Sequence, residues 1–335
     1  MKSDKPINYA SEPWFPSQND AFTLFAAITH DCNLKCSHCF AANDGEHSIS
    51  LSDKQWFALF DQLSELENPR LFFTGGEPLK HKSFIKFATY SVKKSIPVIL
   101  ATNATTITPS ISKELFSIGI NDVRVSIDGS CAEIHDKLRG DGAFELAKNG
   151  TTLLLSEGMN VSVRTTVNKL NFDELEKIAD FIVGLGINLW EIKHIIPAGR
   201  AHTSGLLTLP KDRINALNSV EKIYKFGSYP NLEIKLMEGI LHPCANICEG
   251  IKIASCPAGA RMMVVQPTGD VIPCGYLASS VIGNITKMSL KEIRQKWSEK
   301  DKFQLPACCK DCKHKELCGG GCPAYNFCDE SVMCD

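Results

Sequence analysis

Short apolar runs alternate with helix-length amphipathic segments through the first two thirds of the chain, and this alternation constrains the fold most strongly. The apolar runs predict strands at 22–29, 71–74, 97–102, 122–127, 160–167 and 188–193. The intervening segments predict helices at 52–67, 82–94, 109–118, 143–157 and 172–184. Strand–helix alternation implies parallel strands joined by right-handed crossovers, so six such units predict an α/β fold, a partial (βα)6 TIM-like barrel.

Composition and pattern divide the chain into four expected segments. A chain of 335 residues with 44% hydrophobic residues can bury one large core and a smaller one. The middle of the chain carries little pattern beyond a predicted helix at 211–226, and cysteine usage rises sharply after it. The expected segments are an N-terminal arm at 1–21, a partial barrel at 22–200, a bridging region at 201–243 and a small cysteine-rich domain at 244–335.

The charge balance excludes several classes of partner. Lys and Arg total 36 against 38 Asp and Glu, which leaves no basic excess for binding nucleic acid or an anionic membrane surface. The chain shows neither the apolar core of a signal peptide nor an apolar run that would span a bilayer, so we expect a cytoplasmic protein. Thiols stay reduced in that compartment, so 15 cysteines in spaced clusters indicate metal sites rather than disulfides.

Three cysteines follow the first expected strand at C-x3-C-x2-C spacing: Cys32, Cys36 and Cys39. Three thiolates are one too few for a closed tetrahedral zinc site or a four-cysteine cluster, so a metal held here keeps one open coordination position. Taken alone, the stretch also fits a structural zinc site completed by a distant residue, or three unrelated buried thiols.

A glycine-rich turn, Gly75-Gly76-Glu77-Pro78, follows the second expected strand. Ligands in such folds bind at the carboxyl ends of the strands. The two glycines allow close backbone approach to a ligand, and the Glu77 carboxylate is suited to accept a hydrogen bond from an ammonium group. Taken alone, the motif is more often a turn with an exposed acid.

Together, the cysteine triad and this turn one strand later resemble the radical S-adenosylmethionine (SAM) enzymes. The resemblance implies that Cys32, Cys36 and Cys39 hold a [4Fe-4S] cluster whose fourth iron is chelated by SAM, and that Glu77 meets the methionyl amine. The further SAM-binding residues that it implies are His38, Gly75, Gly76, Asn103, Ser126 and Arg139. Ala104 departs from the glycine usual after the asparagine, which puts the local turn geometry in question.

Four more polar residues lie near the same expected strand ends: Arg164, Asn168, His194 and Arg200. They either face a substrate or satisfy buried polar groups, and the sequence favours neither role.

Eleven of the cysteines fall in the last 92 residues. A predicted hairpin at 263–274 ends in one of them, and the run Cys318-Gly319-Gly320-Gly321-Cys322 wraps backbone tightly. Paired cysteines also fit a zinc ribbon. The spacing resembles the SPASM domain, which implies two auxiliary [4Fe-4S] clusters, three clusters in all. The ligands it implies are Cys309, Cys312, Cys318 and Cys334 (with Cys328 as the alternative to Cys334) in one cluster, and Cys248, Cys256, Cys274 and Cys322 in the other.

The resemblance implies reductive cleavage of SAM to a 5′-deoxyadenosyl radical. That radical abstracts hydrogen from a peptide, which is then cross-linked, cyclised or epimerised. The expected electron donor is a protein such as flavodoxin or ferredoxin. Only about 21 residues precede the first expected strand, so recognition of a peptide leader would come either from a separate leader-binding protein or from the mouth of the barrel. Cys244 is a candidate hydrogen donor, or an alternative to Cys248 as a cluster ligand.

Two other functions remain open. One is radical SAM modification of a small molecule such as a tetrapyrrole or a sugar. The other is an iron–sulfur electron carrier or redox sensor without catalysis. An open cluster site followed by a ligand-binding turn weighs against a carrier, because a carrier needs no such turn.

Overall fold

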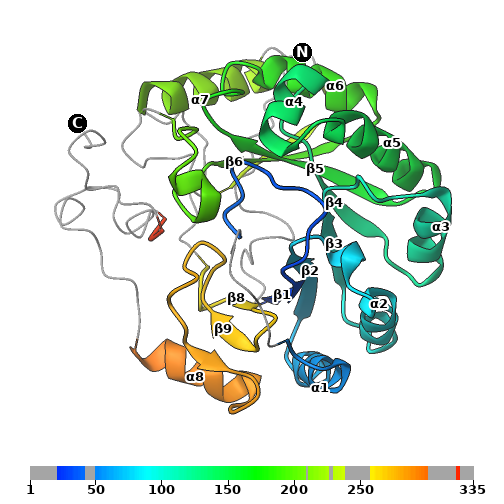
Figure 1. Ribbon diagram of the computed structural model, residues 1–335, viewed down its shortest axis with the longest axis vertical. Helices are drawn as coiled ribbons and strands as arrows, with labels where there is room; N and C mark the ends of the chain where they lie inside the picture. The colour runs from blue at the N-terminus through cyan, green and yellow to red at the C-terminus, as the bar shows by residue number, and fades with distance from the viewer. Residues whose placement is uncertain are drawn as a thin grey trace.

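One ten-stranded sheet organises the molecule, with strand order β10-β9-β8-β1-β2-β3-β4-β5-β6-β7 (Figure 1). The computed structural model describes residues 21–41, 50–208, 210–225, 229–237, 257–300 and 322–324. Seven strands follow one another in chain order and pair in parallel. They are β1 (Phe22–Thr29), β2 (Pro69–Gly75), β3 (Val98–Thr102), β4 (Asp122–Ser126), β5 (Asn160–Val167), β6 (Leu189–His194) and β7 (Glu233–Leu236).

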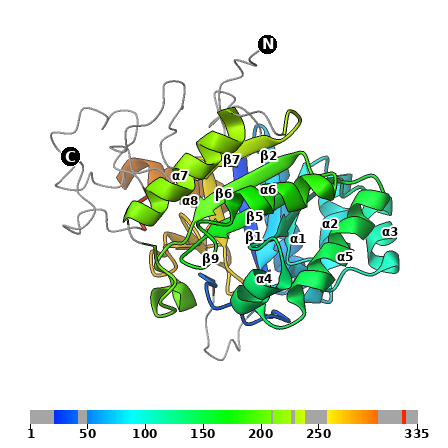
Figure 2. The same ribbon diagram turned by 90° about the horizontal axis from the view of Figure 1, so that it is seen from above.

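The helices pack on the outer face of this curved sheet, as the two views show (Figures 1 and 2). They are α1 (Asp53–Ser64), α2 (Phe84–Lys93), α3 (Pro109–Ser117), α4 (Ala132–Arg139), α5 (Ala143–Ser156), α6 (Leu175–Gly184), α7 (Pro210–Lys225) and α8 (Leu290–Lys300), with 3-10 turns η1 (Pro78–Lys80) and η2 (Gly199–His202). The predicted α/β fold of a partial TIM-like barrel is confirmed. The sequence pattern did not predict β7, α4 or α8.

Local sequence signals explain where α1 begins and which face it buries. The Ser52 side chain caps the helix, and the side-chain oxygen of Gln55 accepts a hydrogen bond from the backbone N–H of Ser52. Trp56 and Phe60 lie one turn apart, are fully buried and contact Phe87 of α2. Phe60 also contacts Phe73 of β2, so this aromatic layer packs α1 and α2 against the sheet.

The predicted hairpin forms from β8 (Met262–Val265) and β9 (Asp270–Ile272), with Gly269 at positive φ in its turn. The short β10 (Gly283–Asn284) pairs with β9. The hairpin continues the barrel sheet, because β8 pairs in parallel with β1. The start of a separate domain at residue 244 lies outside the described residues and stays a prediction.

Among the described residues, none of the helices has the length and apolar character required to cross a lipid bilayer.

Candidate active site

A cavity of about 280 Å³ opens at the carboxyl ends of the parallel strands and is lined by Cys32, Cys36 and Cys39. Most residues predicted to bind the cofactor line the same cavity: His38, Gly75, Gly76, Asn103, Ser126 and Arg139. The structure therefore brings together side chains that lie more than a hundred positions apart in the chain.

The backbone of the cysteine loop is held by hydrogen bonds to two distant elements, α4 and η2. Ser37 N–H donates to the carbonyl of Leu138 at 2.9 Å, which ties the loop to α4. The Arg200 side chain donates from Nε to the carbonyl of Cys36 at 2.9 Å. The backbone N–H of Arg200 donates to the carbonyl of Cys39, also at 2.9 Å. A side chain at Gly199 would collide with the carbonyls of the loop, so this close approach requires glycine. Arg200 thus braces the loop.

The three thiols share one electrostatic environment. Burial raises the pKa of Cys36 and of Cys32, the neighbouring thiol of Cys39 raises both further, and the Arg139 guanidinium works in the opposite direction. Thiolates that oppose one another's ionisation need positive charge between them, and iron in a cluster supplies it. In the part of the chain that the structure describes, no three His, Cys, Asp or Glu side chains converge as ligands of a single metal ion.

The glycine pair lets the end of β2 pack against the end of β1. Gly75 has φ +125°, and a Cβ atom on Gly76 would collide with the carbonyl of Asp31. Glu77 N–H donates to that carbonyl at 2.8 Å. The backbone after β2 is therefore fixed beside the start of the cysteine loop.

The Glu77 carboxylate is almost completely buried, with 1% of its surface exposed. It accepts hydrogen bonds from Asn103 N–H at 2.8 Å, Thr102 Oγ1 at 2.9 Å and Leu79 N–H at 3.3 Å. Burial raises the pKa of Glu77 to about 7, although these hydrogen bonds oppose the shift. The carboxylate joins the glycine turn to the end of β3, and its contact with the methionyl amine stays a prediction.

Asp128 joins three parts of the site. Its carboxylate lies 3.0 Å from His38 Nε2 and 2.7 Å from Arg139 Nε, and it accepts from Thr166 N–H at 2.7 Å. Burial alone would raise the pKa of Asp128, but Arg139 and His38 hold it well below its ordinary value. Burial of the His38 ring lowers the pKa of His38, although the contact with Asp128 opposes this shift. The sequence prediction selected Ser126 from the end of β4 and missed Asp128, two residues later.

Asn103 connects the turn after β3 to the cysteine loop. Its Nδ2 donates to Asn33 Oδ1 at 3.0 Å, and its Oδ1 accepts from Thr105 N–H at 2.9 Å. Ala104 follows with φ +59°, a left-handed conformation that normally favours glycine. The alanine thus occupies a backbone conformation that glycine would adopt without strain.

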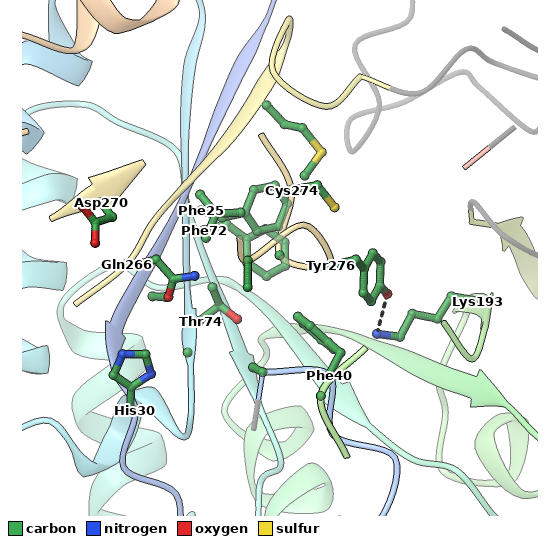
Figure 3. A pocket seen from close by; sticks show the side chains of 18 of the residues that line it. Phe25, His30, Phe40, Phe72, Thr74, Lys193, Gln266, Asp270, Cys274 and Tyr276 are labelled. Atoms are coloured by element: carbon green, nitrogen blue, oxygen red, sulfur yellow. Dashed lines mark hydrogen bonds between the residues drawn. The ribbon is translucent and has the colours of Figure 1, made fainter. Parts of the chain in front are cut away.

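A second cavity, of about 490 Å³, adjoins the first. The two share several lining residues: His30, Phe40, Thr74, Gly75, Arg124, Arg164, Lys193 and Tyr276. Cys274 and Cys322, two of the predicted auxiliary-cluster ligands, also line the second cavity. Figure 3 shows Tyr276 from the loop after β9 reaching Lys193 of β6, with Phe40 of the cysteine loop beside them.

A cluster of charged residues lies on the sheet between the two cavities. The fully buried Glu191 pairs with Arg124 and with Arg164, whose Nε lies 2.9 Å from Glu191 Oε2. Both guanidiniums lie over the ring of Phe72, at 4.8 Å and 5.8 Å from its centroid. Lys193, two residues beyond Glu191, lies over the ring of Phe40 at 5.0 Å.

Sequence reasoning singled out only Arg164 of this cluster. A usable signal was present, because polar residues recur two positions apart at three strand ends, where alternate side chains share a face. The pairs are Arg124 with Ser126, Arg164 with Thr166, and Glu191 with Lys193.

Two other polar residues at the strand ends satisfy buried groups. His194 is 1% exposed and hydrogen-bonds to Thr208 and to the carbonyl of Ile195. Asn168 is fully buried, donates to the carbonyl of Thr166 and accepts from Leu170 N–H.

The remaining predicted site residues lie outside the described residues. They are Cys244, Cys248, Cys256, Cys309, Cys312, Cys318 and Cys334.

Comparison with known proteins identifies the family. The radical SAM superfamily model matches residues 27–182, and the SPASM model, an iron–sulfur cluster-binding domain, matches residues 256–313. The AdoMet-dependent heme synthase of Methanosarcina barkeri is 30% identical over 318 residues, which span 88% of each chain. The mycofactocin maturase MftC of Mycolicibacterium smegmatis is 25% identical over 340 residues, 98% of this chain and 84% of that protein.

A solved structure supports the fold. Streptococcus suis SuiB bound to the precursor peptide SuiA matches 94% of this chain and 75% of its own, with a TM-score of 0.73 and 17% identity. The radical SAM fold binds SAM and a [4Fe-4S] cluster, for which the three thiols and the adjoining cavity are suited. The chain belongs to the radical SAM superfamily and carries a SPASM iron–sulfur cluster-binding domain in its C-terminal region.

Proposed function

We propose that the protein reductively cleaves SAM and directs the resulting 5′-deoxyadenosyl radical at a carbon–hydrogen bond of a substrate held in the second cavity. The observation that carries this proposal is the junction of the two cavities, which share Phe40, Thr74, Arg164, Lys193 and Tyr276 as lining residues. A radical formed in the first cavity would meet a substrate in the second without crossing bulk water.

The residues around the first cavity have distinct proposed roles. Cys32, Cys36 and Cys39 hold the cluster, and the backbone at Gly75 and Gly76 lies against SAM. The remaining proposed contacts to SAM are His38, Glu77, Asn103, Ser126 and Arg139. Asp128 positions two of them, because it fixes both His38 and Arg139 by buried charge-assisted contacts.

The second cavity is suited to oxidation of the substrate after hydrogen abstraction. Cys274 and Cys322 line it, and Cys322 packs with Tyr276 in a small apolar cluster. We assign these two cysteines, with Cys248 and Cys256, to one auxiliary cluster, and Cys309, Cys312, Cys318 and Cys334 to the other. An external donor such as flavodoxin or ferredoxin would supply the initial electron.

The first candidate substrate is a peptide, which becomes cross-linked, cyclised or epimerised. Its support is the similarity to a mycofactocin maturase and to a structure that holds a precursor peptide. In this proposal, a separate leader-binding protein presents the peptide.

The second candidate substrate is a tetrapyrrole, and two observations favour it. The heme synthase of Methanosarcina barkeri matches over 88% of both chains. The second cavity also combines aromatic rings of Phe25, Phe40 and Phe72 with cationic side chains, which suits a planar molecule that carries carboxylates.

The test is a SAM cleavage assay with anaerobically reconstituted protein and dithionite. We expect 5′-deoxyadenosine and methionine, both lost in the Cys36→Ala variant. Reducible clusters without any SAM cleavage would instead support the electron carrier or redox sensor. Turnover with Fe-coproporphyrin III, an iron tetrapyrrole that carries carboxylates, is compared with turnover of short peptides encoded beside the gene, and this comparison decides between the two substrate classes.

A further inference from the structure

We propose that Lys193 and Arg164 form a carboxylate-binding subsite in the second cavity, which anchors a carboxylate of the substrate. This inference deepens the proposed function and rests on it, since it assumes that the second cavity holds the substrate. Neither residue belongs to the cysteine motifs or to the glycine turn.

The first step of the argument is the charge of the cavity wall. Arg124, Arg164 and Lys193 line the cavity, and both arginines pair with the buried carboxylate of Glu191. Asp270 also lines the cavity, but its carboxylate accepts hydrogen bonds from Thr268 Oγ1 and Asn284 Nδ2, both at 2.8 Å within the hairpin region. These neutral donors leave the Asp270 carboxylate charged, so three cationic side chains stand against two carboxylates, Glu191 and Asp270, and the positive charge exceeds the negative by one.

The second step concerns the ammonium group of Lys193. It lies 3.2 Å from Tyr276 Oη, a neutral partner, and over the rings of Phe40 and Tyr276 at 5.0 Å and 5.6 Å. Within the described ranges, no acidic side chain lies at ion-pair distance from it. Burial lowers the pKa of Lys193 to about 7, and Arg164 adds to the shift. A carboxylate bound here would restore the missing counter-charge and form a charge-assisted hydrogen bond.

The third step concerns what the carboxylate is attached to. The rings of Phe25 and Phe72 stack at 4.6 Å, and with Met262 and Val264 they give the cavity a mostly apolar wall (Figure 3). Apolar walls with a few placed polar groups are typical of small-molecule sites. The expected ligand is an apolar or aromatic group with a carboxylate, which is either a propionate of a tetrapyrrole or a carboxylate of a peptide.

The test uses 4-phenylbutyrate and its primary amide as probes, titrated calorimetrically into SAM-bound holoenzyme. We expect the amide to bind at least about tenfold more weakly than the acid, since it cannot pair with a cation. Lys193→Gln should weaken binding of the acid severalfold toward the level of the amide, with only Arg164 left to pair with it, while Lys193→Arg should keep most of the affinity. Lys148→Gln, on an exposed lysine of α5 paired with Glu145, is the matched control and should change nothing.

Two results would overturn the subsite. One is equal binding of acid and amide to the wild-type protein. The other is a Lys193→Gln variant that binds the acid normally but loses affinity for SAM, since Lys193 also lines the first cavity and would then serve the SAM carboxylate. SAM affinity is therefore measured for every variant and should stay within about twofold of wild type.

The source of the carboxylate is decided with Fe-coproporphyrin III and its tetramethyl ester, followed by the porphyrin absorption band. Binding of the acid but not the ester, lost in Lys193→Gln, supports the subsite and assigns it to a tetrapyrrole. Absence of porphyrin binding, with phenylbutyrate binding still dependent on Lys193, supports the subsite and assigns it to a peptide. SAM cleavage is assayed separately, so the subsite stands even where the proposed reaction fails.

Discussion

The carboxylate of Glu77 accepts a 2.8 Å hydrogen bond from the backbone N–H of Asn103, so one buried side chain joins the glycine turn after β2 to the turn after β3. Asn103 in turn donates to Asn33 in the cysteine loop. Three segments that surround the first cavity are thus linked through two side chains, and a change at Glu77 should be felt at the SAM site rather than in the iron content.

Glu77→Gln should weaken SAM binding by roughly ten- to a hundredfold at pH 8, because it removes a buried charge-assisted hydrogen bond worth about 1.5–3 kcal/mol. The iron content should not change. Glu67→Gln, at an exposed position after α1, is the control. Equilibrium binding of SAM to reconstituted protein checks the prediction, and an unchanged affinity would show that the carboxylate serves only the turn.

The pH dependence of stability should also reflect Glu77. Its pKa in the folded protein is raised to about 7 from an ordinary value of 4.5. The folded protein therefore keeps a proton that the unfolded chain loses. The stability that this retained proton contributes is complete below about pH 4.5. It decreases as the pH rises from about 4.5 through 7, by up to about 3 kcal/mol in all.

Glu77→Gln removes this titration. The unfolding temperature of the variant should therefore rise relative to that of wild type as the pH increases from 5.5 to about 7.5, the upper part of this window. Parallel curves for the two proteins across this range would show that Glu77 does not titrate there.

Asp128→Asn should destabilise the protein by about 3 kcal/mol or more, because it leaves the Arg139 guanidinium buried without its counter-charge. It should also weaken SAM binding, since Arg139 and His38 lose the carboxylate that positions them. Glu133→Gln breaks the exposed Glu133–Lys137 pair on the same helix α4 and should cost less than about 1 kcal/mol. Chemical unfolding of the wild type and the two variants measures the loss of stability at the buried and at the exposed position. Equal losses of stability in the two variants would refute the role of Asp128.

Reconstituted protein should hold three [4Fe-4S] clusters, which corresponds to about twelve irons per chain. Combined Cys32→Ala, Cys36→Ala and Cys39→Ala should remove about four irons and all SAM cleavage. Iron and zinc analysis checks the count. A wild-type protein with about four irons, or with mainly zinc, would contradict the auxiliary clusters.

The sequence predicted six of the seven parallel strands, β1 to β6, because each contains the short apolar stretch that a buried strand requires. It missed β7, which has only four residues, two of them charged. It missed α4, which is short and highly charged, although its Arg139 is only 8% exposed. That burial depends on Asp128, a partner eleven positions away, and helix periodicity carries no information about such a pairing.

The residues of the candidate site also fall into two groups, those that local sequence patterns identify and those that depend on strand register. Cysteine spacing and the glycine turn are local patterns, so the cysteine triad and the turn residues of the first cavity could be located from the sequence, whereas Arg124 and Lys193, which line the same cavity, could not. The cluster around Glu191 depends on strand register, which places Arg164 opposite Glu191 in neighbouring strands. Arginine and lysine are mostly exposed in proteins, so composition favours a surface role for these residues until the register is known.

Ala104 offers a test of backbone strain at the site. Its φ of +59° costs an alanine about 1–2 kcal/mol, which Ala104→Gly would recover. The substitution would also remove a buried methyl group worth about 0.8 kcal/mol and would raise the conformational entropy of the unfolded chain, and both effects destabilise the protein. The net change in stability should stay within about 0.5 kcal/mol. Ala88→Gly, at a fully buried position in α2 with ordinary helix geometry, should cost about 2 kcal/mol. Gly150→Ala should cost about 1–3 kcal/mol, because its methyl group would collide with the carbonyl of Ala104. Chemical unfolding measures all three, and an Ala104→Gly loss as large as that of Ala88→Gly would show that the turn is not strained.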